Sequence, residues 1–205
     1  MTDNNQDRTK QIKKHITKGG RFYGKKTEHV QGNLAPGTDK ALQPYFDMMA
    51  RVCNQWALFE MTLDQTIWGL VDATPSYAAC LTSNMGSSHQ KLKAANALLT
   101  IWPDTQELVK RVNKLSGGLE KVVRKRNRVI HDPIGYDPEN QLVLAYRSIA
   151  DKKEDFGWGI ADIHEYRNTN AEIKKLLDNF STLSNDILSH VSSQKKPMPL
   201  HFDRP

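Results

Sequence analysis

The sequence predicts an all-α fold, an up-and-down helical bundle with a small β-hairpin insertion before the last helix. Three observations predict it. Apolar residues recur every three or four positions over long stretches, which is the period of one buried helix face. Capping residues and prolines mark helix starts and stops between these stretches. After Pro133 the apolar period becomes that of a strand, and the helical period returns at about Asp162.

The first three helices follow from these signals. A long helix is predicted over about Asp39–Val71, with Thr38 or Asp39 as its cap. A short helix is expected over Pro75–Met85, and a further one runs from Ser87 or Ser88 to Trp102, where Pro103 stops it. The apolar stripe of the long helix comprises Met49, Val52 or Cys53, Trp56, Leu63, Ile67 and Leu70.

A fourth helix opens with the capping-box pattern of residues 104–107 and carries an apolar face to His131. Gly117–Gly118 lies in its middle, where a kink is expected. Residues 142–147 and 156–160 are expected to form the hairpin, and a last helix spans about Asp162–Val191. The apolar face of the fourth helix comprises Leu108, Val112, Leu115, Leu119, Val122, Val129 and Ile130.

These elements place one helical domain at residues 39–192. Residues 1–38 contain several glycines and no apolar period, so we expect a flexible basic N-terminal arm there. Residues 193–205 contain three prolines, and we expect a flexible C-terminal tail.

Composition narrows the class of protein. Cys53 and Cys80 are the two cysteines of the 205 residues, so we expect no disulfide framework, a cytoplasmic location, and Cys53 in the core. No apolar run approaches the ~20 residues that span a membrane, so we expect no membrane partner. Neither a zinc-ligand spacing nor a phosphate-binding glycine loop occurs, and we expect no metal and no cofactor.

The positive charge is concentrated in two segments of a chain with net charge +6. Residues 1–40 carry nine Lys or Arg against four Asp or Glu, and residues 107–128 carry eight against two. Such segments suit a polyanionic partner, with nucleic acid ahead of membrane because no amphipathic membrane anchor is evident.

The fourth helix ends in the run Arg124–Pro133, which closes on His131. Basic residues at a helix C-terminus are ordinary, because they offset the negative end of the helix dipole. However, Arg126 falls in the apolar row, where a charge is costly unless it is paired or lines a cleft. Glu60 is likewise a charged residue on the apolar stripe of the first helix. An ion pair between Glu60 and Arg126 is therefore the simplest structural explanation of the two charges.

Residues 126–131, Arg-Asn-Arg-Val-Ile-His, resemble the motif of the HEPN superfamily, in which an arginine, usually followed by a polar residue, precedes a histidine by four to six residues. Arg126 is the better match, and Arg124 also satisfies the looser spacing. With Trp56–Glu60 on an early helix, the resemblance covers about residues 40–192. The resemblance implies that the protein is a metal-independent endoribonuclease. It also implies a dimer, in which the arginine and histidine of two copies form one composite cleft. The family also implies toxin–antitoxin and phage-defence settings, in which a cognate antitoxin is a further partner.

The chemistry can also be argued from the residues. His131 can serve as acid or base because imidazole exchanges its proton near neutral pH. Arg126 would supply a fixed bidentate cation, Asn127 could orient the phosphate or His131, and Glu60 could hold Arg126 or share in proton transfer. An ideal helix separates Arg126 and His131 by about 140° around its axis, so the motif requires a distorted helix end or a cleft that both side chains reach from its margins. The expected RNA-binding residues, for tRNA or single-stranded RNA, are Arg124, Lys125, Arg128 and Lys121.

Three functions remain open from the sequence. The first is a homodimeric, metal-independent endoribonuclease. The second is a non-catalytic HEPN-like module that binds RNA, a nucleotide or a protein. The third is a structural helical dimer in which Glu60 and Arg126 pair across the core.

Overall fold

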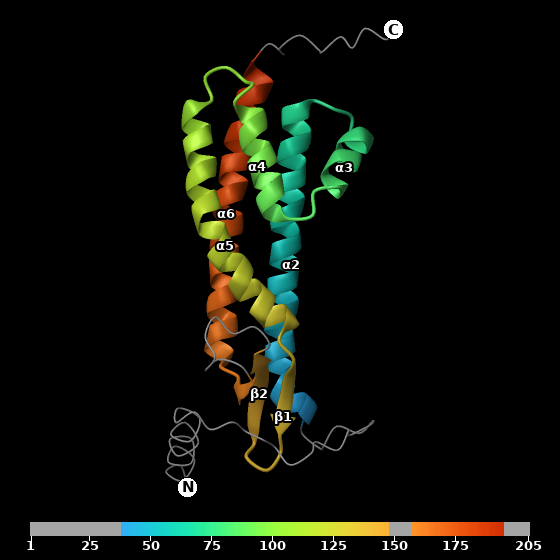
Figure 1. The fold of residues 1–205 in the computed structure, drawn as a ribbon, viewed down its shortest axis with the longest axis vertical. Coiled ribbons are helices and arrows are strands. Elements are labelled where there is room, and N and C mark those ends of the chain that lie inside the picture. The colour runs from blue at the N-terminus through green and yellow to red at the C-terminus, as the bar shows by residue number, and fades with distance from the viewer. Residues whose placement is uncertain (1–37, 148–156, 195–205) are drawn as a thin grey trace. The chain divides into compact units, whose positions relative to one another are not determined.

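The computed structural model describes residues 38–147 and 157–194. Almost all of the predicted N-terminal arm and most of the predicted C-terminal tail lie outside these residues. The elements in chain order are α2 (Thr38–Val71), α3 (Pro75–Ser83), α4 (Ser88–Leu99), α5 (Gln106–His131), β1 (Ile134–Asp137), β2 (Leu142–Arg147), β3 (Gly157–Ile160) and α6 (Ile163–Ser193). The predicted helical fold, with strands placed before the last helix, is confirmed (Figure 1).

The chain forms two compact units, and three long helices contribute to both. The sheet unit contains the described residues of 38–49, 127–147 and 157–166. The bundle unit contains residues 50–126 and 167–194. Within α5 the boundary falls between Arg126 and Asn127, inside the motif.

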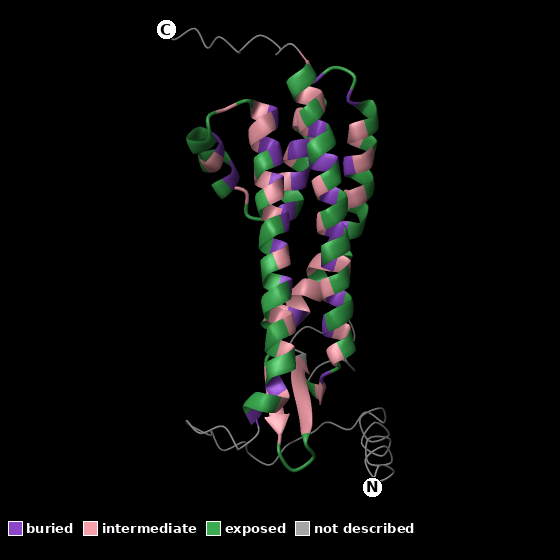
Figure 2. Cartoon of the chain, turned by 180° about the vertical axis from the view of Figure 1, so that it is seen from behind, coloured by how far each residue is buried: buried purple, intermediate pink, exposed green. Residues whose placement is uncertain are grey.

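In the bundle unit, α2, α4, α5 and α6 run side by side (Figure 1). Helices α2 and α6 are parallel, because Phe59 packs on Phe180 and Thr66 on Ser184 at nearly the same sequence offset. In these two helices the residues coloured as buried lie on the inward faces, and the exposed residues lie outside (Figure 2). The fully buried large side chains of this unit are Val52, Phe59, Leu63, Thr66, Ile67, Leu92, Leu99, Val112, Leu119, Ile173, Phe180 and Ile187.

The choice between Val52 and Cys53 for the first apolar stripe is resolved by this core. Val52 is fully buried, whereas Cys53 is exposed. The prediction that Cys53 lies in the core is therefore wrong. Val52 and Phe59 are seven residues apart, two helical turns, and so share the buried face, while Cys53 is turned by about 100° from Val52.

Local capping signals set the two ends of α4. Ser87 is the N-cap of α4, and its side chain accepts a hydrogen bond from the backbone N–H of Gln90 at 3.2 Å. The Thr105 hydroxyl donates to the carbonyls of Leu99 and Trp102, so it closes the end of α4. Helix α5 then begins at Gln106 and continues without interruption through the two glycines to His131.

The sheet unit contains a three-stranded antiparallel sheet in the order β1-β2-β3. The predicted hairpin corresponds to β2 and β3, in which Tyr146 pairs with Trp158. Strand β1, paired with β2 through Gly135 and Leu144, is additional to the prediction. Its four residues come directly after Pro133, and the segment is too short to show a strand period.

Candidate functional site on helix α5

Arg126 is half-buried in the bundle unit, as its position in an apolar row predicts. Its guanidinium carbon lies 5.6 Å from the centroid of the Trp56 ring, and Trp56 itself is only 5% exposed. A cation over an indole face gains about 0.5 to 2 kcal/mol, more when the pair is shielded from water. The aromatic ring therefore lowers the cost of placing this charge on a helix face that packs inward.

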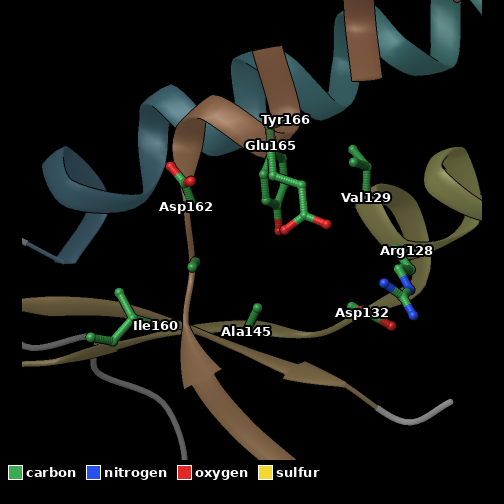
Figure 3. Close-up of a pocket in the computed structure, with 9 residues that line it drawn as sticks. Arg128, Val129, Asp132, Ala145, Ile160, Asp162, Glu165 and Tyr166 are labelled. Carbon is green, nitrogen blue, oxygen red and sulfur yellow. The ribbon is translucent and has the colours of Figure 1, made fainter. Parts of the chain in front are cut away.

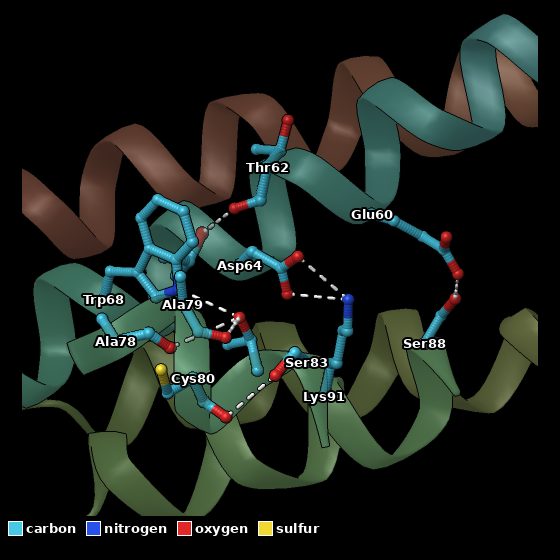
Figure 4. Close-up of polar contacts among 12 residues, drawn as sticks. Glu60, Thr62, Asp64, Trp68, Ala78, Ala79, Cys80, Ser83, Ser88 and Lys91 are labelled. Atoms are coloured by element: carbon cyan, nitrogen blue, oxygen red, sulfur yellow. Dashed lines mark hydrogen bonds and ion pairs between the residues drawn. The ribbon is translucent and has the colours of Figure 1, made fainter. Parts of the chain in front are cut away.

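Glu60 lies one helical turn after Trp56 and is also half-buried. Its carboxylate accepts a hydrogen bond of 2.7 Å from the hydroxyl of Ser88, the first residue of α4 (Figure 4). A carboxylate at this place also interacts favourably with the positive end of the α4 dipole. Among the described residues, this is the partner of Glu60, in place of the predicted ion pair with Arg126.

A second polar contact between α2 and α4 lies one turn further along. The ammonium of Lys91 lies 2.8 Å from Asp64 Oδ1 and 3.0 Å from Asp64 Oδ2 (Figure 4). Both side chains are largely shielded from solvent, with 12% and 23% exposed. Glu60 and Asp64 therefore fix the register of α2 against α4, which is a structural task.

The predicted RNA-binding residues of the bundle unit differ in their surroundings. Lys125 forms an ion pair with Glu172 of α6, and both side chains are partly buried. Lys121 and Arg124 are exposed. Because the Lys125 charge already has a carboxylate partner, it is less suited to an external phosphate than its two neighbours.

The rest of the motif lies in the sheet unit. Asn127 and Arg128 are half-buried, while His131 is exposed at the last position of α5. The helix stays regular at this end, since the Asp132 N–H still donates to the Arg128 carbonyl at 3.1 Å. The helix distortion that the sequence prediction allowed for is therefore not seen in α5 up to His131.

A small cavity of about 20 Å³ lies inside the sheet unit. Glu165 and Tyr166 project into it from α6, and Arg128 and Asp132 line it from the end of α5 (Figure 3). This volume holds one water molecule, not a nucleotide. The remaining lining residues are Val129, Ala145, Ile160, Ala161 and Asp162.

Tyr45 is a titratable group of the sheet unit whose pKa is clearly shifted. Its hydroxyl donates to the Ala161 carbonyl at 3.0 Å, and its ring meets Tyr166 edge-on. Burial raises the pKa of Tyr45 above its ordinary value of 10.0, and the negative charge of Asp162 raises it further. The phenol therefore stays protonated at neutral pH and acts as a hydrogen-bond donor.

Two partners of the motif helix, Trp56 and Glu172, were not predicted from the sequence. Trp56 was assigned to the core, and its place one turn before Glu60 was the signal that an aromatic ring and a charge share this face. No sequence pattern indicated Glu172 as a partner of Lys125, because this pairing depends on the register between α5 and α6.

The chain was compared with family models, curated proteins and solved structures. No family model, curated protein or solved structure matches the chain. Within residues 38–147 and 157–194, no helix combines the length and apolar character of a membrane span. The same residues hold no cluster of three His, Cys, Asp or Glu side chains arranged for a metal ion.

Proposed function

We propose that this protein is a HEPN-like, metal-independent endoribonuclease of a defence or toxin–antitoxin type, acting as a homodimer. The observation that carries the proposal is the state of the two motif residues. Arg126 is half-buried against Trp56, which gives it a restricted orientation, while His131 is exposed at the end of the same helix. A held cation and an accessible imidazole are the groups that RNA cleavage needs.

The reaction assigned to these groups is an intramolecular transesterification of the RNA phosphodiester. A base removes the proton of the ribose 2′-hydroxyl, whose oxygen attacks phosphorus, and an acid gives a proton to the departing 5′-oxygen. The products are a 2′,3′-cyclic phosphate and a 5′-hydroxyl. Arg126 balances the negative charge that develops on the phosphoryl oxygens, and His131 performs one of the proton transfers.

The homodimer follows from the count of proton-transfer groups. One motif supplies one histidine, whereas the reaction uses a separate base and acid. Two copies of His131, one from each protomer, provide both. Asn127 is assigned to orienting the phosphate, and Glu60 to keeping α2 and α4 in register, because Ser88 holds its carboxylate.

The test is RNA cleavage by purified protein in the presence of a chelator, with three variants. His131→Ala removes the proton-transfer group, and a loss of about 10² to 10⁴ in rate is expected. Arg126→Lys keeps a charge beside Trp56 but loses the planar, bidentate donor, and a large loss is expected there too. His164→Ala changes an exposed histidine on α6 and should cleave like the wild type.

Mixing wild-type protein with an excess of His131→Ala protein tests the composite cleft. After subunit exchange a mixed dimer carries a single His131 and lacks either the base or the acid, so activity should fall more steeply than in proportion to the wild-type fraction. Cleavage that His131→Ala retains in full would contradict the proposal.

A second candidate is a non-catalytic HEPN-like module that binds RNA without cutting it. The exposed, basic outer side of α5 favours it, since Lys121 and Arg124 are open to solvent. In that case His131→Ala binds RNA with the affinity of the wild type, and neither the wild type nor any variant cuts RNA in the assay.

A further inference from the structure

Helix α5 carries seven Lys or Arg between residues 107 and 126, and four of them have a defined partner. These four pairs are Lys110 with Glu107 at 3.7 Å, Arg111 with Asp186 at 2.7 Å, Lys125 with Glu172, and Arg126 with Trp56. For Lys114, Lys121 and Arg124, the described part of the chain offers no ion-pair or hydrogen-bond partner, and all three are exposed. Within residues 107–126 of α5, these three positions therefore carry the positive charge that has no partner in the described part of the chain.

The three cations share one side of the helix. At about 100° per residue, Lys114 and Lys121 differ by about 20° around the axis, and Arg124 lies about 60° further on. Along the axis, Lys114 and Arg124 are about 15 Å apart at the α-helical rise. Arg126 is rotated by about 140° from Lys121, so this outer face of α5 is turned away from the face on Trp56.

Two glycines lie between the cations on the same side. Outside the helix's own backbone, a Cβ at Gly117 or Gly118 would meet no atom of the described residues within 4 Å, so nothing in the described part of the chain packs against this turn. A glycine in a helix interior lowers stability relative to alanine. Internal packing gives no reason for the pair, whereas a partner that approaches the helix backbone closely does.

We propose that the outer face of α5, formed by Lys114, Gly117, Gly118, Lys121 and Arg124, binds the phosphodiester backbone of single-stranded RNA. Lysine and arginine donate charge-assisted hydrogen bonds to phosphate oxygens and carry no base preference there. The two glycines leave room for the strand to lie against the helix. The identity of this polyanion rests on the proposed function, and the surface is separate from the face of Arg126.

Nucleic acid is favoured over an anionic membrane by the absence of apolar groups. A helix that lies in a membrane interface presents large apolar side chains beside its basic ones. The exposed large apolar residues of the described chain lie on α2, α3, β3 and the turn after α4, and none is on α5. The face is also a single helix wide, which suits one strand of RNA better than a duplex.

Salt-dependent binding tests the charge contribution directly. The probe is a fluorescent polyuridine oligonucleotide, and the background protein is His131→Ala, so that cleavage does not interfere. Each phosphate contact that is lost makes the slope of log K against log salt less steep by about 0.7 for a single strand. Lys114→Gln, Lys121→Gln and Arg124→Gln should each show such a decrease.

Two matched controls accompany these variants. Lys93→Gln removes an exposed lysine from α4, and Lys125→Gln removes the lysine that already has Glu172 as its partner. Both should keep the slope of the parent protein. An equal decrease in the slope for all lysines would mean that only net charge matters, and it would overturn the assignment of this face.

The glycines give a test that unfolding cannot imitate. Gly117→Ala and Gly118→Ala should raise resistance to urea because they favour the helix, yet they should weaken RNA binding several-fold because each adds a side chain to the contact. Stabilised protein with unchanged affinity would overturn the proposed close approach.

The two proposals fail in distinguishable ways. If the wild type cleaves RNA and the triple variant of Lys114, Lys121 and Arg124 keeps the full salt slope, the binding face is wrong and the catalytic proposal stands. If RNA binds through these residues and is never cut, the binding face is right and the catalytic proposal is wrong. Tighter binding to phosphatidylserine vesicles than to RNA, lost in the same triple variant, would replace RNA by a membrane and overturn the inference.

Discussion

The close contact of α2 with α6 makes Gly69→Ala a demanding test of the bundle. A Cβ at Gly69 would overlap Leu188 Cδ2, and it would lie 3.6 Å from Leu188 Cγ. Thr66, one turn earlier, is hydrogen-bonded to Ser184 of α6 at 2.7 Å, so the two helices are held together at this level. Relief of the overlap therefore has to come from Leu188, and overpacking of this kind costs about 1 to 3 kcal/mol.

Gly118→Ala is the matched control for helix propensity. Its Cβ would enter open space, so this change should stabilise the protein by about 0.5 to 1 kcal/mol. In a Leu188→Ala background the overlapping atom is gone, and Gly69→Ala should no longer be destabilising. Urea unfolding followed by far-UV circular dichroism gives the free energies of unfolding of the wild type, Gly69→Ala, Leu188→Ala and the double variant. From this double-mutant cycle we expect a coupling free energy of about 1 to 3 kcal/mol. A coupling near zero would refute the close packing of α2 against α6.

The remaining predictions concern charge and titration. Arg126→Ala should lower the free energy of unfolding by about 0.5 to 2 kcal/mol because the cation over the indole is lost, whereas His131→Ala, at an exposed position, should change it by less than about 0.5 kcal/mol; equal costs in urea unfolding would contradict this. Lys91→Met should cost about 1 to 3 kcal/mol, because it leaves the shielded Asp64 carboxylate without its cation; a neutral effect in the same assay would show that the pair contributes little. Because the pKa of Tyr45 is raised in the folded state, the folded protein holds this proton more tightly than the unfolded chain, and stability should fall as pH rises above about 10. Absorbance titration of the wild type against Tyr45→Phe should therefore place this phenolate above pH 10, and ionisation at or below pH 10 would contradict the assignment.

The helices were predictable because their apolar stripes repeat over many turns. The stripe of α2 runs from Val52 to Leu70, and its buried members match the expected spacing. A long stripe averages out single ambiguous positions such as Cys53. Strand β1 offers no such repeat, since Ile134–Asp137 is only four residues long and its pairing with β2 is a tertiary choice.

The inward packing of Arg126 was predictable from the sequence, and its contacts were not. The apolar row of α5 indicated that Arg126 packs inward, and the structure has it half-buried. Which group meets it depends on the register of α5 against α2, and a shift of one turn exchanges Glu60 for Trp56. The sequence records no such register, so an ion pair was predicted where the structure has a cation–π contact.

The central claim, a metal-independent ribonuclease with Arg126 and His131 as its catalytic pair, is tested most directly by the ends of the RNA products. Wild-type and His131→Ala proteins would be incubated in chelator with mixed tRNA and single-stranded RNA, and the ends identified by phosphatase and kinase treatment. We predict fragments with 2′,3′-cyclic phosphate and 5′-hydroxyl ends from the wild type, and intact RNA with the variant. Identical fragments from both proteins, or intact RNA from both, would contradict the claim.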